Sequence, residues 1–288
     1  MDRFELSWGR HTLSLGRRTC VMGVVNVTPD SFSDGGQFFD AASAIAHGRQ
    51  LAAQGADILD IGGESTRPFA ESVDETEEIR RVVPVIEALA EAVAVPISID
   101  TTKAAVARRA LEAGAAMVND ISALGLEPEL GAVAAEFDVP LILMHMQGQP
   151  RTMQVQPHYD DLLGEIRQYL AAAMAAAREQ GVANSRLIVD PGIGFGKTVD
   201  HNMQIITNLG QLQDLGVPLL IGTSRKSFIR NTLKTGLFAG EDPPPGAVET
   251  GTQASVAAAI LAGAHIVRVH DVANTRITCA LVDALRNA

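Results

Sequence analysis

Short apolar segments recur along the chain, and polar, alanine-rich segments separate them. Eight of the apolar segments have the length of a strand. They occupy residues 21–27, 56–63, 96–100, 117–121, 140–146, 186–190, 218–223 and 266–272. Nearly uninterrupted hydrophobic runs of this kind are typical of a parallel sheet that is covered on both faces. The pattern therefore predicts eight buried parallel strands.

The segments between these strands are amphipathic and rich in Ala, Glu and Arg. Several end in Gly followed by a small or β-branched residue, as at Gly55 and Gly216, which is typical of a helix that ends in a left-handed turn before a strand. Eight strands alternating with helices predict an α/β fold of the (β/α)8 barrel type, with a doubly wound open sheet as the alternative. Helices are expected near residues 40–54, 74–92, 103–113, 158–180, 200–215, 249–262 and 273–286.

The two ends of the chain fit one barrel. Residues 1–18 alternate apolar and polar positions, which predicts a β-hairpin and shows no hydrophobic stretch of a signal peptide. Residues 19–288 then suffice for the barrel, and such barrels of about 250 residues usually form a single domain. Because no apolar segment reaches the roughly 18 to 20 residues of a membrane span, we expect a cytoplasmic protein without a membrane partner.

Composition and charge narrow the possible ligands. The formal net charge of −11 disfavours nucleic acid and anionic membranes, so an anionic ligand would need a local cluster of basic side chains. Cys20 and Cys279 lie in apolar segments and have no partner at metal-binding spacing. We expect them to be buried free thiols.

Polar side chains gather where the predicted strands end, whereas the opposite ends carry mostly Gly, Ala, Val and Pro. In a (β/α)8 barrel the strand ends and the loops after them form the active site. Any one of these residues could instead cap a helix or close a turn, but together they predict a site for an anionic small molecule. The strand-end residues are Asn26, Glu64, Thr66, Arg67, Asp100, Asn119, Asp120, His145, Asp190, Arg225, Lys226, Arg268 and His270.

Three other kinds of site fit the sequence poorly. The segment PGIGFGKT has Pro191 where the phosphate loop of nucleotide hydrolases requires Gly. The segment GTSRK lacks the second Gly of a nucleophile elbow, so Ser224 is not expected to be a hydrolase nucleophile. His145, His265 and His270 provide no pair four residues apart on a helix, which disfavours a zinc site.

Eight motifs together resemble the dihydropteroate synthase family of pterin-binding enzymes. They extend from about residue 20 to 275 and read MGVVNVTPDSFSDGG, GGESTRP, SIDT, VNDIS, MHMQGQPRTMQ, DPGIGFGKT, GTSRKSF and VRVHDV. The resemblance implies a (β/α)8 barrel, usually a homodimer, that acts as a transferase in folate biosynthesis. Such an enzyme joins 6-hydroxymethyl-7,8-dihydropterin diphosphate to 4-aminobenzoate and releases pyrophosphate, and sulfonamides compete for its aminobenzoate site.

The resemblance implies a pterin site formed by Asp100, Asn119, Asp190, Lys226 and Arg268. The carboxylate of Asp190 suits the amino group and ring N–H of a pterin, which it can accept together. Lys226 would reach a ring nitrogen and the carbonyl group, and the planar guanidinium of Arg268 could lie across the ring.

The family pattern also implies a diphosphate site with Mg²⁺. Asn26 matches a magnesium ligand, and Thr66, Arg67 and His270 match diphosphate-binding residues. Ser227 and Arg67 are the candidates for binding the carboxylate of 4-aminobenzoate. A loop that excludes water from the diphosphate is expected to contain Thr28, Pro29, Asp30, Ser31, Phe32, Ser33 and Asp34.

The implied reaction is a dissociative substitution at the pterin CH₂, in which Arg67, His270, Lys226 and Asp100 stabilise developing charge. This chain departs from the family at Phe69, where Gly is common, and at Arg230, where a small residue is frequent. Neither change removes a candidate catalytic residue, and turnover rate and drug sensitivity are the properties that they could alter. The alternatives are a methyltetrahydrofolate:corrinoid methyltransferase and a non-catalytic pterin-binding relative.

Overall fold

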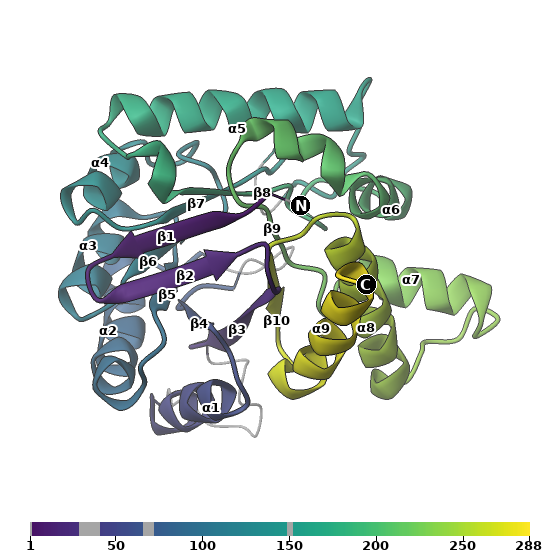
Figure 1. Ribbon diagram of the computed structural model, residues 1–288, viewed down its shortest axis with the longest axis horizontal. Helices are drawn as coiled ribbons and strands as arrows, with labels where there is room; N and C mark the ends of the chain where they lie inside the picture. The colour runs from purple at the N-terminus through teal and green to yellow at the C-terminus, as the bar shows by residue number, and fades with distance from the viewer. Residues whose placement is uncertain (1, 29–40, 66–71, 149–151) are drawn as a thin grey trace.

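The computed structural model describes residues 2–28, 41–65, 72–148 and 152–288 (Figure 1). Within these residues, eight parallel strands form one sheet in the order β8-β7-β6-β5-β4-β3-β10-β9. A parallel bridge between Val189 and Leu219 joins the two ends of this order. The sheet is therefore closed, which confirms the (β/α)8 barrel and makes the open-sheet alternative wrong. The strands are β3 (Cys20–Asn26), β4 (Ile58–Gly62), β5 (Ile97–Asp100), β6 (Met117–Asp120), β7 (Leu141–Met144), β8 (Leu187–Asp190), β9 (Leu220–Ile221) and β10 (Ile266–Val269).

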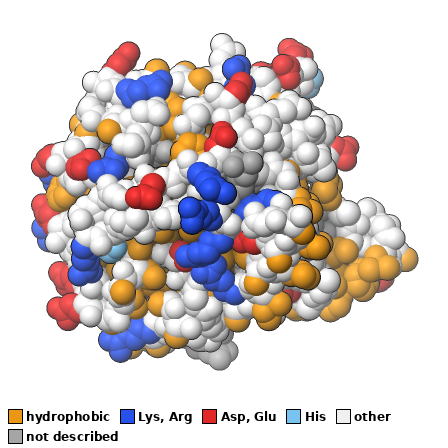
Figure 2. Space-filling model, viewed as in Figure 1, with side chains coloured by type: hydrophobic (Ala, Val, Ile, Leu, Met, Phe, Trp, Pro, Cys, Tyr) orange, Lys and Arg blue, Asp and Glu red, His pale blue; other side chains and the backbone are white. Residues whose placement is uncertain are grey.

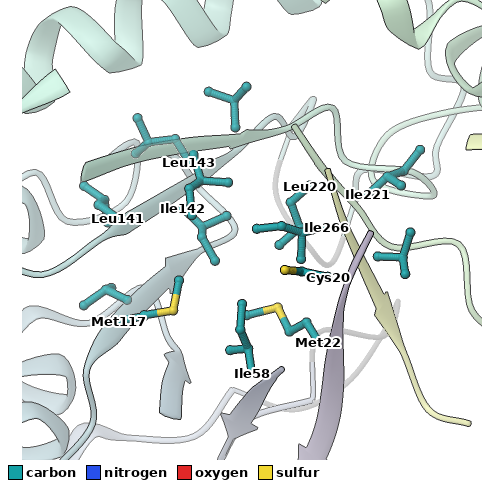
Figure 3. Packing of buried hydrophobic residues seen from close by; sticks show 14 of the residues in the cluster. Cys20, Met22, Ile58, Met117, Leu141, Ile142, Leu143, Leu220, Ile221 and Ile266 are labelled. Atoms are coloured by element: carbon teal, nitrogen blue, oxygen red, sulfur yellow. The ribbon is translucent and has the colours of Figure 1, made fainter. Parts of the chain in front are cut away.

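Almost every strand position is buried, and aliphatic side chains fill the interior of the barrel. Figure 3 shows Cys20, Met22 and Ile58 lying near side chains of β7, β9 and β10 in this core. Full burial of one such side chain contributes roughly 1.5–3 kcal/mol. Each of the eight predicted strands overlaps an observed one, since the apolar runs that predicted them are the runs that pack here.

Helices surround the barrel (Figure 1). Side-chain oxygens of Asp74, Asp161 and Asp271 accept backbone N–H groups at three helix starts. The helices after Asp74 and Asp161 begin later than the hydrophobic pattern alone indicates, and the helix after Asp271 begins one residue earlier, at Val272. The helix expected at 200–215 is an α-helix followed by a 3₁₀ segment, and two short helices, α4 and α7, lie outside the ranges given above for the expected helices. The helices are α1 (Ala41–Ala53), α2 (Glu75–Ala92), α3 (Ala104–Glu112), α4 (Glu129–Glu136), α5 (Leu162–Glu179), η2 (Asn184–Arg186), α6 (Val199–Thr207), η3 (Leu209–Leu215), α7 (Ser227–Gly236), α8 (Pro245–Leu261) and α9 (Val272–Arg286).

The expected N-terminal hairpin is confirmed as β1 (Phe4–Trp8) paired with β2 (His11–Leu15). It lies across the amino ends of the barrel strands, where the Trp8 Nε1–H donates to the carbonyl of Ala116 at 2.7 Å. The ring of Phe4 meets His265, just before β10, edge to face. The hairpin thus covers one end of the barrel and leaves the carboxyl ends of the strands for the site.

Cys20 and Cys279 are buried free thiols, as expected. Burial is the largest cause that raises the pKa of each thiol to about 12, so neither is a reactive thiolate at neutral pH. Among the described helices, none combines the length and the apolar character that crossing a bilayer requires.

Candidate functional site

Arg268 links several strands at the carboxyl end of the barrel. Its Nε donates to Asp60 Oδ2 and its Nη2 to Asp100 Oδ2, both at 2.6 Å. The Asn119 amide donates to the same oxygen of Asp60 at 3.1 Å. The network joins β10 to β4, β5 and β6, so it holds the Arg268 guanidinium in one orientation.

Asp60 is a site residue that the sequence reasoning missed. Its side chain is fully buried, and among the described atoms its second oxygen, Oδ1, has no hydrogen-bond partner. A charged residue inside the otherwise apolar segment ILDIG was the available signal, because a buried carboxylate nearly always has a cationic partner.

Asp100 lies beside this network with 11% of its side chain exposed. Burial raises its pKa above the ordinary value, and the charge of Arg268 opposes that shift. The carboxyl group therefore lies at the boundary between the buried network and the open end of the barrel.

Asp190 and Lys226 form the other half of the site. Asp190 ends β8, and its Oδ1 accepts the Gly192 N–H at 2.7 Å. Burial raises the pKa of Asp190, whereas it lowers the pKa of Lys226 to about 8, and the charge of each opposes the shift of the other. The Lys226 ammonium donates to the Ile193 carbonyl and lies 4.7 Å from the centre of the Phe195 ring.

The glycines of the PGIGFG segment allow this close packing. Gly192 has a φ of +71°, and a Cβ there would collide with the carbonyl oxygen of His145. Gly196 has a φ of +66°, and its Cβ would lie 2.6 Å from the carbonyl oxygen of Gln147. The glycines let the loop after β8 pack on the end of β7, a structural role distinct from that of a nucleotide phosphate loop.

Four strand-end residues contact the protein's own groups. Asp120 accepts the backbone N–H groups of Ser122 and Leu124, which fixes the turn after β6. The other three residues each contact a side chain. Glu64 lies 2.5 Å from Lys103, His145 lies 2.9 Å from Lys197, and Arg225 lies 3.3 Å from Glu249. These four residues therefore make structural contacts within the protein, which is the alternative to ligand binding that the sequence left open for a polar strand end.

His270 and Ser227 lie on the side of the site formed by β9, β10 and the loops after them. The His270 Nδ1 is 2.9 Å from the hydroxyl of Ser224, which the sequence reasoning had considered only as a nucleophile. Ser227 is exposed at the first turn of α7, where Lys226 provides no side-chain cap for the backbone N–H groups. Uncapped N–H groups at a helix start attract anionic oxygens.

Asn26, the predicted magnesium ligand, lies at the end of β3. Within the described residues its side-chain amide has no hydrogen-bond partner, and no cluster of three acidic, histidine or cysteine side chains could hold a metal. A single amide oxygen fits Mg²⁺ that is bound mainly through phosphate oxygens and water.

Several predicted residues lie outside the described residues. They are Thr66, Arg67, Phe69 and the loop residues Pro29, Asp30, Ser31, Phe32, Ser33 and Asp34. Thr28 and Arg230 are described, and Arg230 is exposed on α7.

Comparison with known proteins gives consistent results. The family model described as pterin binding enzyme matches residues 22–270. A dihydropteroate synthase of Synechocystis is 50% identical over 277 residues, which cover 96% of this chain and 93% of the relative. The structure of Xanthomonas albilineans dihydropteroate synthase with 4-aminobenzoic acid is 43% identical, with a TM-score of 0.89 and full coverage of both chains. Yersinia pestis dihydropteroate synthase in a sulfonamide drug complex is 43% identical, with a TM-score of 0.90 and 99% of each chain covered.

Proposed function

The chain belongs to the dihydropteroate synthase family, and from that premise we propose that it condenses (7,8-dihydropterin-6-yl)methyl diphosphate with 4-aminobenzoate. The products are 7,8-dihydropteroate and pyrophosphate. The observation that carries the proposal for the site is the convergence of two buried acids, Asp60 and Asp190, and the partly exposed Asp100 on one arginine and one lysine at the carboxyl end of the barrel. A flat heterocycle with donors on one edge and acceptors on another suits these groups.

The pterin is bound between the two halves of the site. Asp190 Oδ1 already accepts a backbone N–H, so Oδ2 is the oxygen that accepts the pterin amino group and ring N–H. Asn119 and Asp100 contact the neighbouring ring atoms, and Lys226 donates to a ring nitrogen and to the carbonyl group. Arg268, held by Asp60 and Asp100, lies against the ring face.

The diphosphate is bound by His270, Thr66 and Arg67, and Asn26 supplies its amide oxygen to Mg²⁺. When bound, Mg²⁺ offsets negative charge on the leaving group. Thr28, Pro29, Asp30, Ser31, Phe32, Ser33 and Asp34 cover the diphosphate and exclude water, which would otherwise attack the activated CH₂.

The reaction breaks the bond between the CH₂ and the diphosphate oxygen, and the electron pair leaves with pyrophosphate. His270 and Arg67 hold that growing negative charge, while Asp100 faces the pterin ring as it becomes positive. The amine of 4-aminobenzoate, whose carboxylate is bound at Ser227 and Arg67, then forms the C–N bond and gives up one proton, which reaches bulk solvent when the products leave. No covalent bond to the protein is required.

We also propose that the protein is a cytoplasmic homodimer and that residues 1–288 form one domain. Exposed leucine and isoleucine side chains on α8 and α9 support association between copies, because single domains seldom leave several large apolar residues together in water. The free thiols Cys20 and Cys279 are compatible with a reducing compartment.

A pyrophosphate-release assay tests the proposed function. Purified protein is supplied with dihydropterin diphosphate, 4-aminobenzoate and Mg²⁺, each component is omitted in turn, and the organic product is identified by mass. We expect pyrophosphate and dihydropteroate only in the complete mixture. Binding of the pterin diphosphate without dihydropteroate would instead support the methyltransferase or non-catalytic alternative.

A further inference from the structure

Ser224 makes two contacts with His270. The Ser224 Oγ lies 2.9 Å from the ring atom Nδ1, and it accepts the His270 backbone N–H at 3.2 Å. Ser224 precedes Lys226 in the loop after β9, and His270 follows β10, so the contacts join neighbouring strands of the barrel. One hydroxyl therefore holds both the main chain and the ring of His270.

We propose that Ser224 is a positioning residue that fixes the neutral tautomer of His270, with the proton on Nε2. The inference rests on the proposed function for its consequence, because His270 is placed there at the diphosphate. The Nε2–H would then be a donor to a phosphate oxygen, whereas the opposite tautomer would present a lone pair and repel it.

The Ser224 hydroxyl has a single proton, and this favours the His270 tautomer that is protonated on Nε2. A serine hydroxyl has one proton to donate and accepts through its lone pairs, and the backbone N–H of His270 already uses one acceptor position. Within the described residues, Nδ1 is the acceptor in contact with the hydroxyl. If Nδ1 carried a proton, the hydroxyl proton would have no partner in a residue that is only 6% exposed, which is unfavourable.

The loop holds Ser224 in place for this role. Arg225 has a φ of +58°, a left-handed conformation that is strained for a residue other than glycine. Its backbone N–H donates to the Thr252 hydroxyl on α8 at 3.1 Å, and the neighbouring Thr223 hydroxyl accepts that of Ser255 at 2.9 Å. These contacts attach the turn to α8, so Ser224 is directed at His270 before any ligand binds.

The test is a long-range ¹H–¹⁵N correlation spectrum of the full chain labelled with ¹⁵N-histidine, at neutral pH. The His270 signals are assigned by their loss in His270→Gln. We expect a protonated Nε2 and an unprotonated Nδ1 in the wild-type protein and in Ser224→Thr, which keeps the hydroxyl. In Ser224→Ala we expect the two nitrogen shifts to move toward each other as the tautomers mix. Ser7→Ala removes an exposed hydroxyl from the N-terminal hairpin, which contacts neither Ser224 nor His270, and it should leave the spectrum unchanged.

A protonated Nδ1 in the wild type, or an unchanged His270 spectrum in Ser224→Ala, would overturn the proposal. If Ser224→Ala fails to fold, the wild-type spectrum and that of Ser224→Thr still decide the tautomer. In steady-state assays we expect Ser224→Ala to lower kcat about tenfold, because His270 loses the partner that orients it, with KM for 4-aminobenzoate unchanged. A protonated Nε2 in a protein that forms no dihydropteroate would contradict the proposed function and leave the tautomer inference intact.

Discussion

Lys226 needs all three protons of its ammonium group to donate to the Ile193 carbonyl, a ring nitrogen and the pterin carbonyl, yet burial lowers its pKa to about 8. We therefore expect the affinity for a pterin to fall as the pH rises through about 8. In Lys226→Arg the guanidinium stays protonated, so this loss should disappear between pH 7 and pH 10, even if the affinity itself is lower. Calorimetric titration of each protein across this range measures the effect.

Lys234→Arg is a matched control, because Lys234 is an exposed residue of α7 paired with Asp242. The pH dependence of its pterin affinity should follow that of the wild type. If Lys226→Arg lost as much affinity at alkaline pH as the wild type does, the role given to Lys226 would be contradicted.

The same pKa shift affects the stability of the fold in the opposite direction. Between pH 8 and the pKa of about 10.5 in the unfolded chain, the unfolded state binds more protons than the folded state does. Lys226 therefore makes the protein more stable as the pH rises through this range.

The hairpin of β1 and β2 is an element with a structural role at the end of the barrel opposite to the site. Trp8→Phe keeps most of the buried ring but leaves the Ala116 carbonyl without its donor, so we expect a loss of about 1–3 kcal/mol in unfolding free energy. Trp8 is the only tryptophan of the chain, so urea unfolding is followed by circular dichroism. Because the site lies at the other end of the barrel, kcat should be unchanged, and a large fall in kcat would contradict this separation of roles.

The elements also show how far sequence reasoning extends. Apolar runs located all eight barrel strands, because a strand buried on both faces has little choice of residue. The helices α4 and α7 are short, with 8 and 10 residues, and packing against their neighbours stabilises them. Asp60 was missed because its partners, Arg268 and Asn119, come from distant parts of the sequence. Ser224 was examined for nucleophilic chemistry, and only the three-dimensional structure shows its contact with His270.

At the scale of the whole molecule, the exposed apolar residues of α9 form a stripe. Ile277, Leu281 and Leu285 are spaced four residues apart and are 63–70% exposed, and Leu261 at the end of α8 is 61% exposed. Figure 2 shows further hydrophobic side chains over the projecting end of α7 and the segment after it. We expect Leu281→Glu to convert a dimer into monomers, as measured by light scattering after size-exclusion chromatography.

Glu129→Gln is the control for Leu281→Glu. Glu129 is exposed on α4, and its substitution changes a surface charge far from α9 in sequence. Glu129→Gln should elute as the wild type does. A wild-type protein that is already monomeric at micromolar concentration would contradict the proposed dimer. The proposed single domain predicts one cooperative unfolding transition seen by both circular dichroism and calorimetry.

The most direct test of the account is calorimetric binding of 6-hydroxymethylpterin to the wild type and to Asp190→Asn. The account places the pterin amino group and ring N–H on the Asp190 carboxylate, so the amide should weaken binding by at least about tenfold. Asp214→Asn changes an exposed carboxylate that pairs with Arg167 and should bind as the wild type does. Equal affinity of a folded Asp190→Asn and the wild type would contradict the proposed pterin site.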